Sequence, residues 1–137
     1  MKITVETRVT ASPETVWHCW TTPGEIVQWN AASDDWHTTR AEVDLRVGGK
    51  FLSRMESRDG SMGFDFEGQY TRIVEPTLLE AVLGDRMLLV EFISEPDGVT
   101  IRETFDGEDT HSEEAQRQGW QAILDNFARH VEARAAP

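Results

Sequence analysis

Cysteine, tyrosine and basic residues are scarce in this chain of 137 residues. Cys19 is the only cysteine, so no disulfide can form within the chain. Lysine and arginine number 13 against 25 aspartates and glutamates, which gives a formal net charge of −12. This excess of acid argues against nucleic acid and anionic membranes as partners. No apolar run has the length of a membrane-spanning helix or the form of a signal peptide, so we expect no membrane insertion and a cytoplasmic location.

Motifs for the common catalytic and metal sites are also missing. The four histidines show no paired ligand spacing of the kind that zinc sites use. The acidic segment from Asp106 to Asp109 lacks the spacing of a calcium-binding loop. The sequence contains no nucleophile elbow, phosphate-binding loop or dinucleotide fingerprint. We therefore expect no metal and no cofactor, and no motif assigns a catalytic residue.

Large apolar rings, in contrast, are abundant. The chain has five tryptophans and six phenylalanines but one tyrosine. Such rings suit a packed core or a lined cavity better than a surface in contact with water. The length suits one domain, residues 1–137, that is large enough to bury a core.

The longest helical pattern lies near the C-terminus, from Asp109 to Arg134. Its start, Thr110-His111-Ser112-Glu113, has the form of a capping box, in which two side chains satisfy free N–H groups. Apolar residues then recur at helical spacing at Trp120, Ile123, Leu124, Phe127 and Val131. This pattern predicts one long amphipathic helix whose apolar side must be covered by other elements.

The residues before that helix alternate between apolar and polar in the manner of strands. We expect strands over residues 2–10, 36–45, 50–57, 61–74, 77–83, 86–94 and 99–105. Two short helices, starting at Ser12-Pro13 and Thr22-Pro23, follow the first strand. The connections among the last six strands are too short for parallel crossovers. The predicted fold is α+β, with a curved seven-stranded antiparallel sheet wrapped around the long C-terminal helix.

Several stretches resemble one known superfamily. They are residues 12–17 (SPETVW), Trp29-Asn30, residues 44–51 (DLRVGGKF), residues 68–70 (GQY) and Gly119-Trp120. These are similar to the START-like, helix-grip (SRPBCC) superfamily, in the branch named after the activator of heat-shock protein 90 ATPase. Residues 33–37 (SDDWH) and 59–68 (DGSMGFDFEG) resemble a bacterial subgroup of that branch. The resemblance covers nearly the whole chain and implies a cavity between sheet and long helix, which members use for lipids, polyketides, hormones or other apolar molecules.

Strand alternation selects the side chains that we expect to face such a cavity. The strand candidates are Phe51, Met55, Phe64, Phe66, Tyr70, Phe92 and Glu103. Trp36 and His37 are expected at the cavity mouth, and Trp120, Ile123, Leu124 and Phe127 on the helix. The alternative for each apolar residue is that it belongs to an ordinary packed core.

Glu103 interrupts the apolar pattern, because it falls between Ile101 and Phe105 on a face where an unpaired carboxylate is costly. Three interpretations are open. A bulge turns the side chain outward, or Glu103 pairs with Arg40 or His37, or it is a polar anchor with a raised pKa at the cavity wall. Our hypothesis is that Glu103 is buried and paired, and that it orients a polar end of a ligand.

Three functions from different classes fit this sequence. The first, which we favour, is a monomeric or homodimeric protein that binds an apolar small molecule. The second is an enzyme of the polyketide cyclase or aromatase type, with Glu103, His37 and Asp35 as candidates for proton transfer. The third is a chaperone-interaction module, which the name of the resembled branch suggests.

Overall fold

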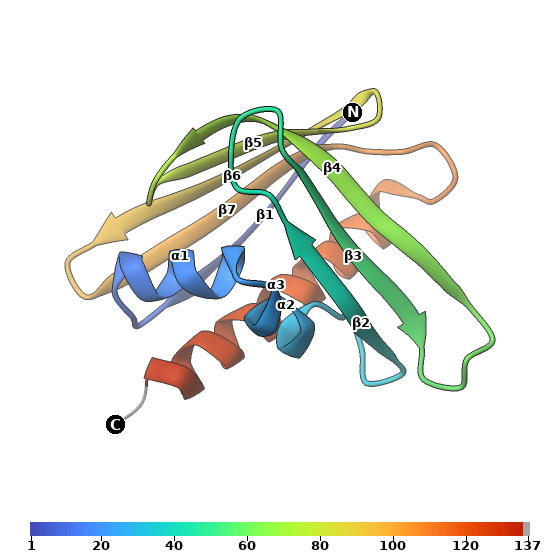
Figure 1. The fold of residues 1–137 in the computed structure, drawn as a ribbon, viewed down its shortest axis with the longest axis horizontal. Coiled ribbons are helices and arrows are strands. Elements are labelled where there is room, and N and C mark those ends of the chain that lie inside the picture. The colour runs from blue at the N-terminus through green and yellow to red at the C-terminus, as the bar shows by residue number, and fades with distance from the viewer. Residues whose placement is uncertain (136–137) are drawn as a thin grey trace.

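The computed structural model describes residues 1–135, and its elements follow the predicted order (Figure 1). The elements are β1 (Lys2–Val9), α1 (Pro13–Thr21), α2 (Pro23–Trp29), β2 (Trp36–Val43), β3 (Lys50–Ser57), β4 (Gly63–Val74), β5 (Leu78–Leu83), β6 (Arg86–Glu95), β7 (Gly98–Asp106) and α3 (Glu113–Ala135).

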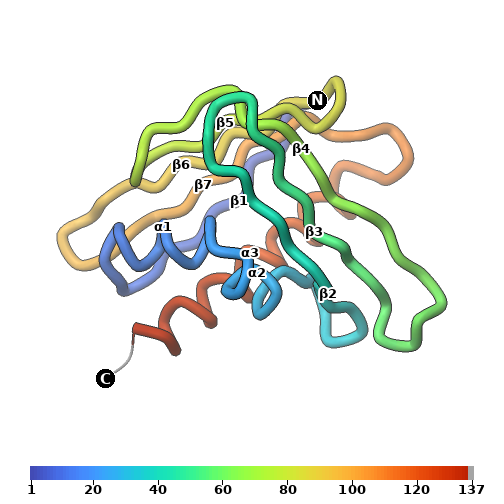
Figure 2. Tube along the Cα trace, viewed as in Figure 1, coloured from blue at the N-terminus to red at the C-terminus, as the bar shows by residue number. Residues whose placement is uncertain are grey.

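The seven strands form one antiparallel sheet in the order β1-β7-β6-β5-β4-β3-β2. Strands β2 to β7 are consecutive neighbours, and β1 joins the far edge by pairing with β7, where Val5 lies opposite Glu103. The sheet curls, and α3 crosses its concave side (Figures 1 and 2). The predicted helix-grip arrangement is therefore confirmed.

The two short helices begin as their sequences predict, whereas the start of α3 differs from the prediction. Ser12 accepts a hydrogen bond from the backbone N–H of Thr15 at 3.2 Å, and Pro13 opens α1. In α3 the capping side chain is Ser112, whose hydroxyl accepts from the N–H of Ala115 at 3.1 Å. The helix thus begins at Glu113, and the predicted capping box starting at Thr110 is wrong. A serine two positions later takes the role that the pattern gave to the threonine.

Helix α3 lies along β1, at one side of the curled sheet. The Gln121 amide donates to the backbone carbonyl of Glu6 at 3.0 Å, and the Glu132 carboxylate accepts from the N–H of Thr10 at 3.0 Å. Of the apolar stripe, Leu124, Phe127 and Val131 are fully buried, whereas Trp120 and Ile123 are only partly covered. The stripe therefore has two parts, a packed C-terminal half and an N-terminal half that borders open space.

An aromatic cluster fills the space under the C-terminal half of α3. Its members come from both short helices, the sheet and α3: Trp17, Trp20, Trp29, Phe92 and Phe127. Phe127 meets Trp20 and Trp29 edge-on, each at a centroid distance of 4.8 Å. Edge-to-face packing of this kind is favourable beyond simple burial. The cluster ties α1 and α2 to the core and closes one end of the space between sheet and helix.

Candidate functional site

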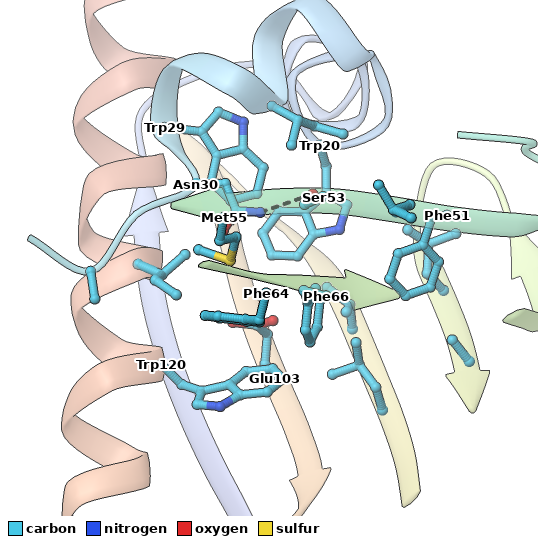
Figure 3. A pocket seen from close by; sticks show the side chains of 18 of the residues that line it. Trp20, Trp29, Asn30, Phe51, Ser53, Met55, Phe64, Phe66, Glu103 and Trp120 are labelled. Carbon is cyan, nitrogen blue, oxygen red and sulfur yellow. Dashed lines mark hydrogen bonds between the residues drawn. The ribbon is translucent and has the colours of Figure 1, made fainter. Parts of the chain in front are cut away.

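A cavity of about 480 Å³ lies between the concave face of the sheet and helices α2 and α3 (Figure 3). Because α3 lies along β1, the concave face of β3 to β6 is left uncovered by the helix. Aromatic rings dominate the walls of the cavity. The aromatic lining residues are Trp20, Trp29, Trp36, Phe51, Phe64, Phe66, Tyr70 and Trp120. A concave site with mostly apolar walls and few polar groups is the usual form of a small-molecule pocket.

Contacts among these rings hold the walls in place. Trp120 stacks on Phe105 with a centroid distance of 3.8 Å and meets Phe66 edge-on at 5.9 Å. Phe51 packs against Tyr70 at 5.1 Å and lies directly over Gly68, where a Cβ atom would come within 2.6 Å of its ring. Gly68 thus leaves the room that Phe51 occupies, and a larger residue would push the ring inward.

Four polar side chains lie within the apolar lining. The Asn30 amide donates to the hydroxyl of buried Ser53 at 3.2 Å, which is the dashed contact in Figure 3. Among residues 1–135, the Tyr70 hydroxyl and the Glu103 carboxyl have no hydrogen-bond partner, although only 6% and 5% of these residues are exposed. Burial raises the pKa of Tyr70 to about 12, so its hydroxyl stays protonated and can donate. The Tyr70 hydroxyl and the Glu103 carboxyl are therefore available to form hydrogen bonds with a molecule in the cavity.

Glu103 lies in the regular part of β7, with Val5 and Val90 on either side. Burial raises the pKa of its carboxyl to about 8, so the group is mostly protonated at neutral pH. The structure confirms that Glu103 is buried, but the bulge and the predicted pairing are both wrong. Arg40 is exposed and binds Glu42 at 3.3 Å, and His37 lies on the opposite side of β2 from the cavity-lining Trp36.

The rim of the cavity carries charged and polar groups that are occupied elsewhere. The Gln116 amide donates to the carbonyls of Glu108 and His111 at 3.0 and 2.9 Å. Burial opposes ionisation of Glu108, but hydrogen bonds from the N–H groups of His111 and Thr110 outweigh it and lower its pKa to about 2. This loop and the side chain of Arg86 border the cavity at the end opposite the short helices.

The structure brings nine of the thirteen predicted residues together around the cavity. They are Trp36, Phe51, Met55, Phe64, Phe66, Tyr70, Glu103, Trp120 and Ile123. Strand alternation and helical spacing account for their common direction. Their contact with a ligand remains a prediction.

The other four predicted residues lie outside the cavity lining. Phe92, Leu124 and Phe127 are packed in the core, because the aromatic cluster fills the space beside them. His37 faces away because it alternates with Trp36 along β2. Sequence alternation gives the side of a strand but not the place where a core ends and a cavity begins.

Sequence reasoning missed the contribution of the short helices. Trp20, Trp29 and Asn30 all line the cavity, at the end where α1 and α2 lie under the sheet. The pair Trp29-Asn30 is one of the stretches that resemble the superfamily, and this was the available signal. The packing of α2 against β2 was the information that the sequence lacked.

A second polar cluster, also missed, lies at the C-terminal end of α3. One carboxylate oxygen of Glu25 accepts from His130 Nε2 at 2.9 Å, from Arg134 Nε at 2.9 Å and from Cys19 Sγ at 3.6 Å. Burial opposes ionisation of Glu25, but these partners outweigh it and lower its pKa. Burial and the nearby Glu25 raise the pKa of Cys19 to about 11.

The same cluster has the residue types of a metal site. The possible ligand atoms of Cys19, Glu25 and His130 lie within 4.8 Å of one another, yet Arg134 already neutralises the carboxylate and the thiol stays protonated. The cluster works as an ion-pair network between α2 and α3.

The curled antiparallel sheet, the long helix across it and the cavity between them define the helix-grip class of START-like proteins. Residues 10–132 match the family described as Activator of Hsp90 ATPase homolog 1-like protein, and the chain belongs to this family.

Solved structures agree with this assignment. An AHSA1-like protein from Aeromonas hydrophila is 51% identical, with a TM-score of 0.91 over 98% of this chain and 94% of its own. A protein from Cytophaga hutchinsonii is 42% identical, with a TM-score of 0.83 over 97% of this chain and 93% of its own. A protein from Chromobacterium violaceum, 21% identical with a TM-score of 0.86 over 96% of this chain and 98% of its own, shares the fold.

No curated protein matches the chain significantly. Within residues 1–135, none of the helices combines the length and apolar character needed to cross a membrane.

Proposed function

We propose that this protein binds an apolar small molecule in the cavity between the sheet and α3. The observation that carries the proposal is the cavity itself, which has a volume of about 480 Å³ and eight aromatic residues in its lining. Burying a ligand against such walls removes apolar surface from water, which is the main source of affinity in sites of this kind.

Binding without catalysis is the function that the polar groups favour. A cyclase-type enzyme needs groups placed to move protons on its substrate. In this cavity Asn30 and Ser53 bind each other, and His37 points away from the lining. Among residues 1–135, Glu103 and Tyr70 are the polar residues of the apolar lining whose side chains bind no other side chain, which suits recognition of a polar end of an apolar ligand.

Filling the cavity tests the proposal. Ala81 is buried in β5 and lines the cavity, so Ala81→Phe places a ring in the space meant for the ligand. We expect the variant to fold and to bind 1-naphthalenemethanol, an uncharged aromatic probe, at least about tenfold more weakly by calorimetry. The matched control, Ala115→Phe at an exposed position of α3, should bind as the wild type does.

Native mass spectrometry of the freshly purified protein adds a second measurement. We expect a retained small molecule in the wild type and less of it in Ala81→Phe. Equal affinity of the wild type and Ala81→Phe for the probe would show that apolar molecules bind elsewhere, and the proposal would be wrong.

A further inference from the structure

Among residues 1–135, Glu103 is the one acidic residue inside the apolar part of the cavity, away from the charged rim. Figure 3 shows its side chain pointing from β7 into the cavity, on the side that Trp120, Phe64 and Phe66 line. Only 5% of the residue is exposed, and none of residues 1–135 donates a hydrogen bond to its carboxyl group. The carboxyl oxygens are not sealed inside the protein but open to the cavity, so a molecule bound there can supply the partner that the chain itself does not.

The other charged residues of the lining do not supply that partner. They are Glu42, Arg86, Glu108 and His111. Glu42 binds Arg40, and Arg86 donates to the backbone carbonyl of Asp106 at 3.3 Å. His111 binds Glu108 at 3.1 Å. Burial alone, with no contribution from a neighbouring charge, raises the pKa of Glu103. Within residues 1–135, no cation therefore pairs with the Glu103 carboxyl group.

The chemistry of the walls indicates which partner fits. Tyr70 already offers an uncharged donor, and an amide or hydroxyl in place of Glu103 would serve a ligand oxygen equally well. What a carboxyl group adds is the ability to carry a full negative charge. With a pKa of about 8, ionising it at pH 7 requires only about a tenfold shift in population.

The surroundings favour a positive charge on the ligand for two further reasons. Aromatic faces attract cations through their electron density, and eight aromatic residues line this cavity. The chain carries a net charge of −12, so its field attracts cations and repels anions.

We propose that the natural ligand is an apolar amine, with a hydrophobic skeleton and one basic nitrogen. Its ammonium group pairs with the Glu103 carboxylate and contacts the neighbouring ring faces. On binding, Glu103 releases its proton to solvent and the amine keeps its own. This inference rests on the proposed function and adds the chemical class of the ligand to it.

Three probes with the same aromatic skeleton separate this inference from the proposed function. Calorimetry at pH 7 compares 1-naphthylmethylamine, 1-naphthalenemethanol and 1-naphthoic acid. We expect the amine to bind at least about tenfold more tightly than the alcohol, and the acid to bind most weakly. If the amine gains nothing over the alcohol, or if the acid binds best, the amine inference is overturned while the cavity proposal stands. If none of the three binds, the proposed function itself fails.

The pH dependence of the amine's affinity is a second test on the unmodified protein. Because Glu103 must lose a proton, the affinity should rise by about tenfold per pH unit from pH 6 toward pH 8 and then level off. The alcohol should show no such rise. A carboxyl group that kept its proton and only accepted a hydrogen bond from the ammonium would instead give an affinity that is flat below pH 8 and falls above it. That result would refute the ion pair.

Glu103→Gln, compared with Glu67→Gln, locates the carboxyl group responsible. Both variants replace one carboxyl group by an amide, but Glu67 is exposed and alternates along β4 with the cavity-lining Phe66, so its side chain faces away from the cavity. We expect Glu103→Gln to lose the preference for the amine and keep its affinity for the alcohol, whereas Glu67→Gln behaves as the wild type does. An equal loss in both variants would mean that the general field of the protein, and not Glu103, selects the amine, and the inference would be wrong.

Discussion

Replacing Glu103 with glutamine should change how stability depends on pH. In the folded protein, burial raises the pKa of this carboxyl from its ordinary 4.5 to about 8. Between these two values the folded state holds a proton that the unfolded state has lost. Stability therefore falls as pH rises through this window, by up to about 1.4 kcal/mol per pH unit. Between pH 5 and pH 8 the wild type should lose on the order of 4 kcal/mol through this one group. Glu103→Gln cannot titrate and escapes the loss.

Urea unfolding of both proteins at pH 5, 6, 7 and 8 measures the effect. The quantity of interest is the free energy of unfolding of the variant minus that of the wild type. This difference should grow steadily with pH, since the amide's own burial cost is the same at every pH and other titrating groups cancel. A difference that stays constant across this range would show that Glu103 ionises freely in the folded protein, and the reasoning from its burial would be refuted.

Three further outcomes are expected. Phe127→Ala should cost about 3–5 kcal/mol in urea unfolding, because its ring is fully buried between Trp20 and Trp29, whereas Ile123→Ala at the cavity border should cost only about 1–2 kcal/mol. Equal costs would mean that Phe127 also borders open space. Gly68→Ala should weaken calorimetric binding of 1-naphthalenemethanol severalfold, because the new Cβ meets the Phe51 ring at 2.6 Å and pushes it into the cavity; unchanged affinity would contradict this. Glu25→Gln should cost about 1–2 kcal/mol at pH 7 by leaving His130 and the half-exposed Arg134 without their shared carboxylate, since solvent screens the arginine. The lowered pKa of Glu25 gives stability that is present above pH 4.5 and lost as pH falls below it, so the cost should shrink in acid, and a cost that persists there would argue against the ion pairs.

Much of the fold could be predicted because its elements are coded locally. Alternation along β3, β4 and β7 gave the inward side of each strand, and so the burial of Glu103. Short turns excluded parallel crossovers and left an antiparallel sheet. The start of α3 was missed because two capping residues, Thr110 and Ser112, stand two positions apart and only the folded loop decides between them.

The candidate site was only partly predictable, because its shape depends on contacts between distant segments. The boundary between core and cavity depends on where Trp20 and Trp29 contact Phe127. The position of these contacts cannot be predicted from a local sequence pattern. The pairing of Glu25 with His130 joins residues 105 positions apart. We expected Glu103 to pair with a cationic residue of the chain. Strand alternation instead points His37 away from the cavity, and Arg40 is exposed and binds Glu42.

The pairing of β1 with β7 sets the order in which the protein can mature during synthesis. Thr4 and Thr104 touch across this pair although they are 100 residues apart in the chain. While the ribosome makes β2 to β6, β1 has no partner in the sheet, and α3 has not yet been made to complete the aromatic lining. Contacts between such distant residues form slowly, because a long loop must close first. The cavity is thus complete only once α3 has packed, and a ligand captured there would link α3 to the strands made before it.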